Sequence, residues 1–251
     1  MKSKIHEYKN KEMQTSIRKK IEDIKHVFFD LDRTLWDFEK NSETVIKALL
    51  IKHDIEKIYK TSADDFIKKY KKINHKLWGL YSQHKITKEE LRSTRFSRTL
   101  ERLGAKNSEL GNLLEKDYIA KSPYQTKLLE GDNEILDYLK PKYKLHILSN
   151  GFKEVQHIKL HESGIKDHFI NIFISEEMGF QKPDREIFHA AQTKAKTNGN
   201  ACIMIGDDFV NDIEGALNAG WKAVYLTPRK KRSFHGDMHQ INSLLELKGL
   251  L

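Results

Sequence analysis

Hydrophobic and polar positions follow two different rhythms along this chain. A short apolar run at residues 27–29 predicts one buried strand. From there to about residue 120, apolar side chains recur at steps of three and four while lysines occupy the other faces, which is typical of amphipathic helices. Four such helices are marked by apolar residues at 45–49, 66–80, 96–103 (ended by Gly104) and 110–118. With no strand between them, they predict a small helical bundle.

From Pro123 onward the pattern alternates between strand and helix. Strands are expected at residues 143–148, 169–174, 201–205 and 223–226. Helices are expected at residues 133–139, 155–162, 184–196, 210–218 and 241–247, the third with Asp184 as its N-cap. This alternation favours a parallel sheet with helices on both faces. The predicted fold class is therefore α/β: a Rossmann-like, doubly wound parallel sheet with a helical bundle inserted after its first strand.

These patterns divide the chain into three parts. Residues 1–24 form a basic N-terminal extension, residues 25–38 and 122–251 the Rossmann-like core, and residues 39–121 the helical insertion. Within the extension, Ile17, Ile21 and Ile24 stand at helical spacing and predict a short helix. We expect the first dozen residues to be disordered.

Composition narrows the possible classes of function. The 251 residues carry 45 Lys and Arg against 36 Asp and Glu, and the net charge of +9 suits an acidic or phosphorylated small molecule. No basic motif is interleaved with aromatic residues, and the basic run at residues 229–232 is expected to be a loop, so nucleic acid is not indicated as a partner. A single cysteine, Cys202, excludes an internal disulfide.

The sequence contains no signal for a membrane or for export. No stretch approaches the ~20 apolar residues that a transmembrane helix needs, and residues 1–25 lack the apolar core of a signal peptide. We therefore expect a cytoplasmic protein. The sequence leaves a monomer and a homodimer equally open.

Two carboxylates directly follow the first predicted strand. Asp30 and Asp32 flank one leucine, and Thr34 adds a hydroxyl group. Burying two acids at the end of a strand is unfavourable unless a cation, a hydrogen-bond network or a reaction uses them. A turn in which Asp32 ties down the loop explains the segment equally well.

The ends of three later strands add further polar groups, and ligands of a doubly wound sheet bind beyond the carboxyl ends of its strands. Ser149-Asn150-Gly151 opens a helix and offers a hydroxyl and main-chain N–H groups that suit an anion, although ordinary capping also accounts for it. Lys182 precedes a helix and is either a surface lysine or a fixed charge in the crevice. Asp207, Asp208 and Asp212 crowd one loop, as the oxygen ligands of a divalent cation do, although the dipole of the following helix also accounts for one or two of them.

Together the four segments match what phosphoryl transfer requires: a nucleophile, a metal and positive groups around the phosphate oxygens. They also resemble, in order, the motifs of the haloacid dehalogenase-like hydrolases, at residues 30–34, 149–151, 182–183 and 206–212. The resemblance covers roughly residues 25 to 230 and implies that residues 39–121 are a mobile helical cap. Residues 173–183 are similar to the pyrimidine 5′-nucleotidases, with the N-acylneuraminate-9-phosphatases as near neighbours.

This resemblance implies roles for the acidic residues. Asp30 is the expected nucleophile, which forms an aspartyl-phosphate, and Asp32 is the expected general acid and then base. The carboxylates of Asp30 and Asp207 and the main-chain carbonyl of Asp32 are expected to hold Mg²⁺. Asp32 also distinguishes phosphatases from other branches, because a halide leaves without an acid and the phosphonate-cleaving branch replaces this residue.

The remaining motif residues are expected to bind the phosphoryl group or to support those that do. The resemblance implies that Ser149 and the amides around Asn150 bind it, and that Lys182 neutralises charge on it and on the nucleophile. Asp212 is expected to support a metal-bound water or to orient Lys182, and Thr34 to fix the nucleophile loop.

Two positions depart from the family pattern. Arg33 stands where the family usually has Asn or Gly, and it either points outward or closes on the cap. Asp208 stands where this branch often has Ser or Thr. The choice between Asp207 and Asp208 as the direct metal ligand therefore stays open.

The function expected from this resemblance is magnesium-dependent hydrolysis of phosphate monoesters of small metabolites, with nucleoside 5′-monophosphates as the expected substrates. Hydrolysis of sugar phosphates or of N-acylneuraminate 9-phosphate, and a phosphomutase reaction, are alternatives on the same fold. A receiver-like phospho-signalling domain is the alternative from another class, although receivers are short and lack an inserted helical bundle.

Overall fold

The computed structural model describes residues 23–105, 107–228 and 237–251. By their contacts these residues divide into two compact units. The core unit contains the described residues up to Trp36 together with Leu128–Lys153 and Gly164–Leu251. The helical unit contains Asp37–Lys127 and Glu154–Ser163. Three sequence-based expectations lie wholly or mostly outside the described residues: disorder of the first dozen residues, the helix at residues 17–24 and the loop at residues 229–232.

The core unit is built on a parallel sheet, as the alternating pattern predicts. The described strands form one six-stranded sheet in the order β3-β2-β1-β4-β5-β6, and every neighbouring pair is parallel. In chain order the strands are β1 (His26–Phe29), β2 (Lys144–Ser149), β3 (Asn171–Ile174), β4 (Cys202–Gly206), β5 (Lys222–Leu226) and β6 (Met238–Ile241). The chain winds outward from β1 to β3 and then returns to β4 on the other side of β1. In doubly wound sheets, ligands bind at such a reversal, beyond the carboxyl ends of the strands.

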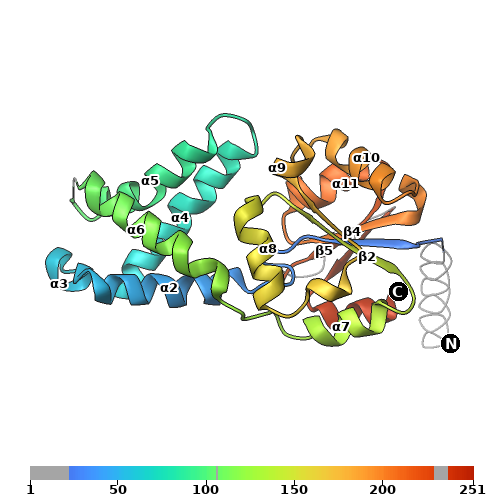
Figure 1. The fold of residues 1–251 in the computed structure, drawn as a ribbon, viewed down its shortest axis with the longest axis horizontal. Helices are drawn as coiled ribbons and strands as arrows, with labels where there is room; N and C mark the ends of the chain where they lie inside the picture. The colour runs from blue at the N-terminus through green and yellow to red at the C-terminus, as the bar shows by residue number, and fades with distance from the viewer. Residues whose placement is uncertain (1–22, 106, 229–236) are drawn as a thin grey trace, which may run out of the picture. The chain divides into compact units, whose positions relative to one another are not determined.

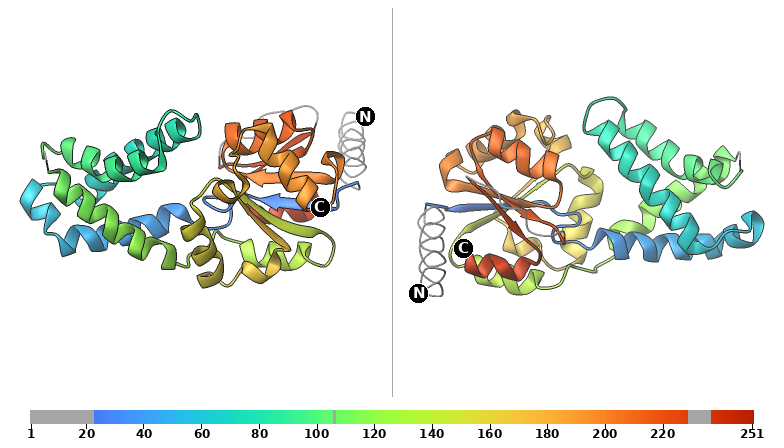
Figure 2. Two further views of the ribbon diagram at one scale, coloured as in Figure 1. Left: turned by 45° about the horizontal axis from the view of Figure 1, so that its top comes forward. Right: turned by 180° about the vertical axis from the view of Figure 1, so that it is seen from behind.

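Helices cover both faces of this sheet (Figures 1 and 2). On one face lie α9 (Ser175–Met178), α10 (Arg185–Lys194) and α11 (Gly215–Asn218), and on the other lie α7 (Asp132–Leu139) and the C-terminal 3₁₀ helix η5 (Leu244–Gly249). The central strands β1 and β4 are buried along their whole length, which is why they read as continuous apolar runs. Phe188 and Trp221 pack edge to face, and the ring of Phe28 also contacts Trp221. The predicted α/β fold class is confirmed.

Short elements differ from the predicted ones. A closing helix is present but differs in bounds and type from the one expected at residues 241–247, because β6 ends at Ile241 and the 3₁₀ helix η5 begins at Leu244. The four residues of β6 have a polar centre and no alternating run, so pairing with the exposed edge of β5, rather than local sequence, makes them a strand. The helix expected at residues 210–218 is divided into the π-helical turn η4 (Phe209–Glu214) and α11. The one-turn helices α3 (Ile55–Tyr59) and α9 were not predicted, since one turn carries too little periodicity.

The helical unit contains the four predicted helices. They are α2 (Phe38–Lys52), α4 (Ala63–Tyr81), α5 (Lys88–Glu101) and α6 (Ser108–Lys121), and most of α8 (Lys153–Glu162) groups with them. Their starts are set by side-chain caps, including a reciprocal capping box between Thr87 and Glu90. Tyr70, Phe96 and Tyr118 form an aromatic cluster among the buried residues of the bundle. Among the described residues, no helix combines the length and the apolar character needed to cross a bilayer.

A buried ion pair joins two helices of the bundle. The Nε and Nη2 atoms of Arg95 in α5 donate to the two carboxylate oxygens of Glu115 in α6, at 2.6 and 2.7 Å. The guanidinium also lies 4.8 Å from the ring centre of Tyr118. Burial by itself lowers the pKa of Arg95, but the surrounding groups, Glu115 among them, raise it overall, so the pair is held in its charged form.

The turn after β1 places Arg33 in a left-handed conformation, with φ of 64°. The main-chain N–H groups of Thr34, Leu35 and Trp36 all donate to the carbonyl of Leu31, so the turn is tight. Asn and Gly adopt this conformation without the clash that a longer side chain suffers. The backbone therefore explains why Asn or Gly is usual here, and it makes Arg33 a strained residue.

Two neutral histidines are paired inside the sheet. Nδ1 of His26 and Nε2 of His146 are 3.0 Å apart, and Nδ1 of His146 lies 3.1 Å from the side-chain nitrogen of Asn171. Burial lowers the pKa of His146 to about 3, and neighbouring His26 and Lys144 act in the same direction. A proton on either ring would place a charge in this buried network.

We expect Arg33→Asn to be more stable than Arg33→Ala by about 1 kcal/mol, since only asparagine tolerates the left-handed backbone and both variants remove the guanidinium. Urea unfolding of the two variants measures the difference. Equal stabilities would contradict a strained main chain at this turn.

Arg95→Met is expected to destabilise the helical unit by about 3–5 kcal/mol, because it leaves the Glu115 carboxylate buried without its partner. The double variant Arg95→Met/Glu115→Met should be less destabilised than this single variant. The readout is the urea transition of the helices, followed by far-UV circular dichroism. Lys71→Met, which removes a partly exposed ion pair with Glu39 and Glu43, is the control and should change stability by less than about 1 kcal/mol.

The pKa of His146 is 6.5 in the unfolded chain and about 3 in the folded one. The free energy of unfolding is therefore expected to fall as the pH decreases through this range. In this range the unfolded chain binds a proton that the folded chain excludes, so acid favours unfolding by at most about 1.4 kcal/mol per pH unit for this site. His146→Leu should flatten the dependence measured by urea unfolding at a series of pH values. His161→Gln, at a mostly exposed side chain, should leave it unchanged.

Candidate active site

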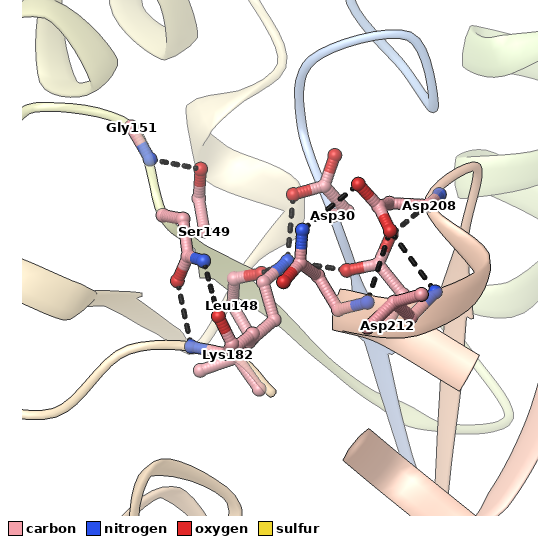
Figure 3. A network of polar contacts seen from close by, with 10 residues as sticks. Asp30, Leu148, Ser149, Gly151, Lys182, Asp208 and Asp212 are labelled. Carbon is pink, nitrogen blue, oxygen red and sulfur yellow. Dashed lines mark hydrogen bonds and ion pairs between the residues drawn. The ribbon is translucent and has the colours of Figure 1, made fainter. Parts of the chain in front are cut away.

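Residues from four neighbouring strand ends meet at the carboxyl edge of the sheet. Asp30 directly follows β1, Ser149 ends β2, and Asp207 directly follows β4. Lys182 stands on the loop that follows β3 and α9. Figure 3 shows Asp30 and Lys182 joined by a hydrogen bond, with Ser149 nearby and paired with Gly151. These residues lie at the carboxyl ends of parallel strands, where the sequence predicts the ligand site.

Lys182 is at the centre of this network, and its side chain is almost completely buried. Its Nζ donates to Asp30 Oδ1 at 2.8 Å, to Asp212 Oδ1 at 2.6 Å and to the carbonyl oxygen of Leu148 at 2.7 Å (Figure 3). Burial alone lowers the pKa of Lys182, but the charges of Asp212 and Asp30 outweigh it and raise the pKa. The lysine is therefore a fixed positive charge and not a surface residue.

Three carboxylates crowd the same space as this single ammonium group. Oxygen atoms of Asp30, Asp207 and Asp212 all lie within 4.8 Å of one another. Burial raises the pKa of Asp30, and the neighbouring charge of Lys182 acts in the opposite direction. Burial, followed by the charges of Asp30 and Asp212, raises the pKa of Asp207 to about 8. Such a cluster is short of positive charge, and hard oxygen donors at this spacing fit a divalent cation such as Mg²⁺.

Asp212 reaches the network through two local features. The π-helical turn η4 places it so that its N–H donates to the carbonyl of Asp208 at 2.9 Å. Its side chain lies against Gly206, where a Cβ atom would be only 2.4 Å from Cγ of Asp212. Only glycine at the end of β4 leaves room for this carboxylate. Burial raises the pKa of Asp212 to about 7, with Lys182 acting in the opposite direction.

The side chain of Asp208 caps the turn that follows it. Its Oδ1 accepts hydrogen bonds from the main-chain N–H groups of Val210 and Asn211, at 3.0 and 2.9 Å. Its Oδ2 accepts from the side chain of Asn211 at 2.8 Å. Asp207 belongs to the carboxylate cluster described above, whereas Asp208 does not.

The segment after β2 is held by its own hydrogen bonds. Ser149 Oγ accepts a hydrogen bond from the N–H of Gly151 at 3.1 Å (Figure 3). The side chain of Asn150 is directed at the main chain of Lys182, with Nδ2 donating to its carbonyl at 2.7 Å. Of the phosphate-binding residues expected here, Ser149 and Lys182 are buried and Asn150 is half-buried.

The loop after β1 holds the remaining predicted residues. Asp32 and Arg33 are half-buried, and the positive charge of Arg33 acts on Asp207 by lowering its pKa. Arg33 is therefore close enough to influence the carboxylate cluster electrostatically. Thr34 is fully buried, and its hydroxyl oxygen has no hydrogen-bond partner within the described chain. Its main-chain N–H, rather than its hydroxyl, ties down the loop.

Sequence reasoning missed two groups that the geometry requires. The carbonyl of Leu148 accepts one of the three hydrogen bonds of Lys182, and a main-chain acceptor leaves no trace in the residue type. Gly206 leaves the space for Asp212. A glycine between a buried strand and an acidic loop is the signal that could have identified it.

Comparisons with known proteins identify the family of this chain. The family model of haloacid dehalogenase-like hydrolases matches residues 24–220. The chain is 32% identical over 228 residues to the pyrimidine 5′-nucleotidase YjjG of Escherichia coli, covering 90% of this chain and 96% of that protein. It is 33% identical over 206 residues to the pyrimidine 5′-nucleotidase PynA of Streptococcus pneumoniae, covering 81% and 84%.

A solved structure leads to the same family. The HAD hydrolase YfnB of Bacillus subtilis, bound to magnesium, superimposes with a TM-score of 0.80 at 29% identity, covering 89% of this chain and 96% of that one. The structural likeness to this hydrolase and a family model that spans most of the sequence thus agree. The chain belongs to the haloacid dehalogenase-like hydrolases.

Proposed function

We propose that this hydrolase is a magnesium-dependent phosphomonoesterase that removes phosphate from nucleoside 5′-monophosphates. The observation that carries the proposal is the Asp30 carboxylate, which lies 2.8 Å from the buried Lys182 ammonium and beside Asp207. A carboxylate next to a fixed cation and a metal-type cluster suits attack on phosphorus, where negative charge must be neutralised.

In the first half of the proposed reaction, Asp30 acts as the nucleophile. Its carboxylate oxygen attacks phosphorus, the bond from phosphorus to the ester oxygen breaks, and an aspartyl-phosphate forms. Asp32 gives its proton to the departing alkoxide, so that the product leaves as an alcohol. Lys182 and the donors around Ser149 and Asn150 neutralise the phosphoryl oxygens.

In the second half, the deprotonated Asp32 takes a proton from water, which attacks phosphorus and releases inorganic phosphate from Asp30. Asp30, Asp207 and the carbonyl of Asp32 would hold Mg²⁺, which supplies positive charge for the phosphoryl oxygens when bound. Asp212 is proposed to orient Lys182, since each of its carboxylate oxygens already accepts a hydrogen bond. The two oxygens of Asp208 cap the turn, which favours Asp207 as the metal ligand.

The substrate class rests on similarity to the two pyrimidine 5′-nucleotidases, which extends over most of this chain. We propose that residues 39–121 act as the cap that completes the substrate site, with residues 25–38 and 122–251 as the catalytic core. Trp78 and Tyr81 of α4 pack edge to face and are partly exposed, so they are candidates for contact with a base.

A second candidate substrate is N-acylneuraminate 9-phosphate. The chain is 28% identical to the human N-acylneuraminate-9-phosphatase over 243 residues, covering 91% of this chain and 94% of that protein. The same catalytic residues would serve either substrate, because both present a phosphate monoester to the core. Only the residues that contact the leaving group would differ.

The catalytic part of the proposal predicts that Asp30→Asn lowers kcat by more than ~1000-fold, because an amide cannot form the aspartyl-phosphate. Activity is measured as release of inorganic phosphate from pyrimidine nucleoside 5′-monophosphates, with and without Mg²⁺. The control is Asp64→Asn, at a surface carboxylate of α4, which should keep full activity. Full activity of Asp30→Asn would contradict its role as nucleophile.

The substrate part is tested by a panel of pyrimidine and purine nucleoside 5′-monophosphates, sugar phosphates and N-acylneuraminate 9-phosphate. We expect the highest kcat/KM for a pyrimidine nucleoside 5′-monophosphate. A preference for another ester would overturn the nucleotidase assignment and keep the phosphatase one. Transfer of phosphate back to the substrate would indicate a mutase, and a long-lived aspartyl-phosphate with negligible turnover a receiver-like domain.

A further inference from the structure

Both polar atoms of the Asn150 amide are engaged by the main chain of a single residue, Lys182. Nδ2 donates to the carbonyl oxygen of Lys182 at 2.7 Å, and Oδ1 accepts from its N–H at 2.8 Å. Ser149 and Ile174 form the last register pair of β2 and β3. The amide of Asn150 thus holds the loop after β3 against the end of β2, beyond the last pair of the sheet.

The other end of Lys182 is held on the same strand. Its Nζ donates to the carbonyl oxygen of Leu148 at 2.7 Å, two residues before Asn150. The two remaining N–H groups of the ammonium are taken by Asp30 and Asp212. The main chain and the side-chain tip of Lys182 are therefore both fixed by the end of β2.

The side chain of Asn150 cannot turn toward a phosphoryl group without breaking both contacts. That rotation would leave the N–H and the carbonyl of Lys182 without these partners next to a buried charge, which is unfavourable. The main-chain N–H of Asn150 takes no part in this contact.

We infer that Asn150 is a positioning residue, whose side-chain amide sets the place of Lys182 relative to Asp30 and does not bind the phosphoryl group. The effect of this positioning on hydrolysis rests on the proposed function, in which Lys182 neutralises charge during attack by Asp30. A fixed supporting residue of this kind determines how well a charge is aimed in the transition state.

A double-mutant cycle between Asn150 and Lys182 tests how Asn150 acts. Asn150→Ala should lower kcat about 10–100-fold with little change in KM, because a small displacement of a catalytic charge is enough for such a loss. In the Lys182→Met background, Asn150→Ala should cause no further loss, since its only route of action is then absent. Independent losses that multiply, with a raised KM, would overturn the inference and indicate direct phosphate binding.

The chain offers a matched control at Asn41. Its Nδ2 donates to the carbonyl of Lys127 at 2.8 Å and its Oδ1 accepts from the N–H of Lys127 at 3.1 Å, so it makes the same pair of hydrogen bonds away from the carboxylate cluster. Asn41→Ala should therefore lose comparable stability. Asn41→Ala should lower kcat/KM by the same factor with and without Lys182→Met. If Asn41→Ala caused no further loss in the Lys182→Met background, as expected for Asn150→Ala, the inference would be overturned.

A second measurement needs neither substrate nor Lys182→Met, which leaves carboxylates buried without their partner and can fail to fold. Acetic anhydride labelling followed by peptide mass spectrometry should find Lys182 protected in the unaltered protein, because it is 2% exposed. Asn150→Ala should increase its labelling at least several-fold, and Asn41→Ala should not. Unchanged protection in Asn150→Ala would overturn the positioning inference, whereas absence of phosphatase activity in the unaltered protein would overturn the proposed function alone.

Discussion

A buried ammonium group between two carboxylates governs the arrangement of this site. The side chains of Asp30 and Asp212 are withdrawn from water at the edge of the sheet, where like charges repel strongly. Lys182 makes their burial possible by donating a hydrogen bond to each. It needs a rigid support in turn, which the end of β2 provides. The positions of the π-helical turn, of Gly206 and of the loop after β3 all follow from the need to keep these three charges together.

The core of the fold could be predicted from periodicity because burial and local sequence agree there. The run at residues 27–29 becomes β1, and the apolar spacing of residues 66–80 becomes α4. Where an element depends on a distant partner, local pattern fails. The strand β6 forms because it pairs with the edge of β5. The residues of β6 show no alternation of apolar and polar positions from which a strand could be predicted.

In the candidate site, too, the features that depend on local sequence could be predicted, and those that depend on distant contacts could not. Asp30, Ser149, Lys182 and Asp207 could be nominated from sequence because parallel strands place their carboxyl ends at one edge. Their chemical roles stay predictions. The partner of Asn150 could not be foreseen, since its contact joins residues 32 positions apart through main-chain atoms. The conformation of the turn at residue 33, which makes asparagine or glycine the easier choice, is likewise a property of the folded backbone.

The hydrogen bonds of Asn150 also bear on the chemical lifetime of the chain, because the next residue is Gly151. In an Asn-Gly sequence the glycine nitrogen can attack the side-chain carbonyl carbon and expel ammonia, which closes a succinimide ring. Water then opens this ring to leave an aspartate or isoaspartate. Here Lys182 holds both atoms of the amide, and the N–H of Gly151 donates to Ser149 Oγ. The folded site therefore shields its own asparagine from deamidation, and ageing of the protein at this residue depends on how often the loop opens.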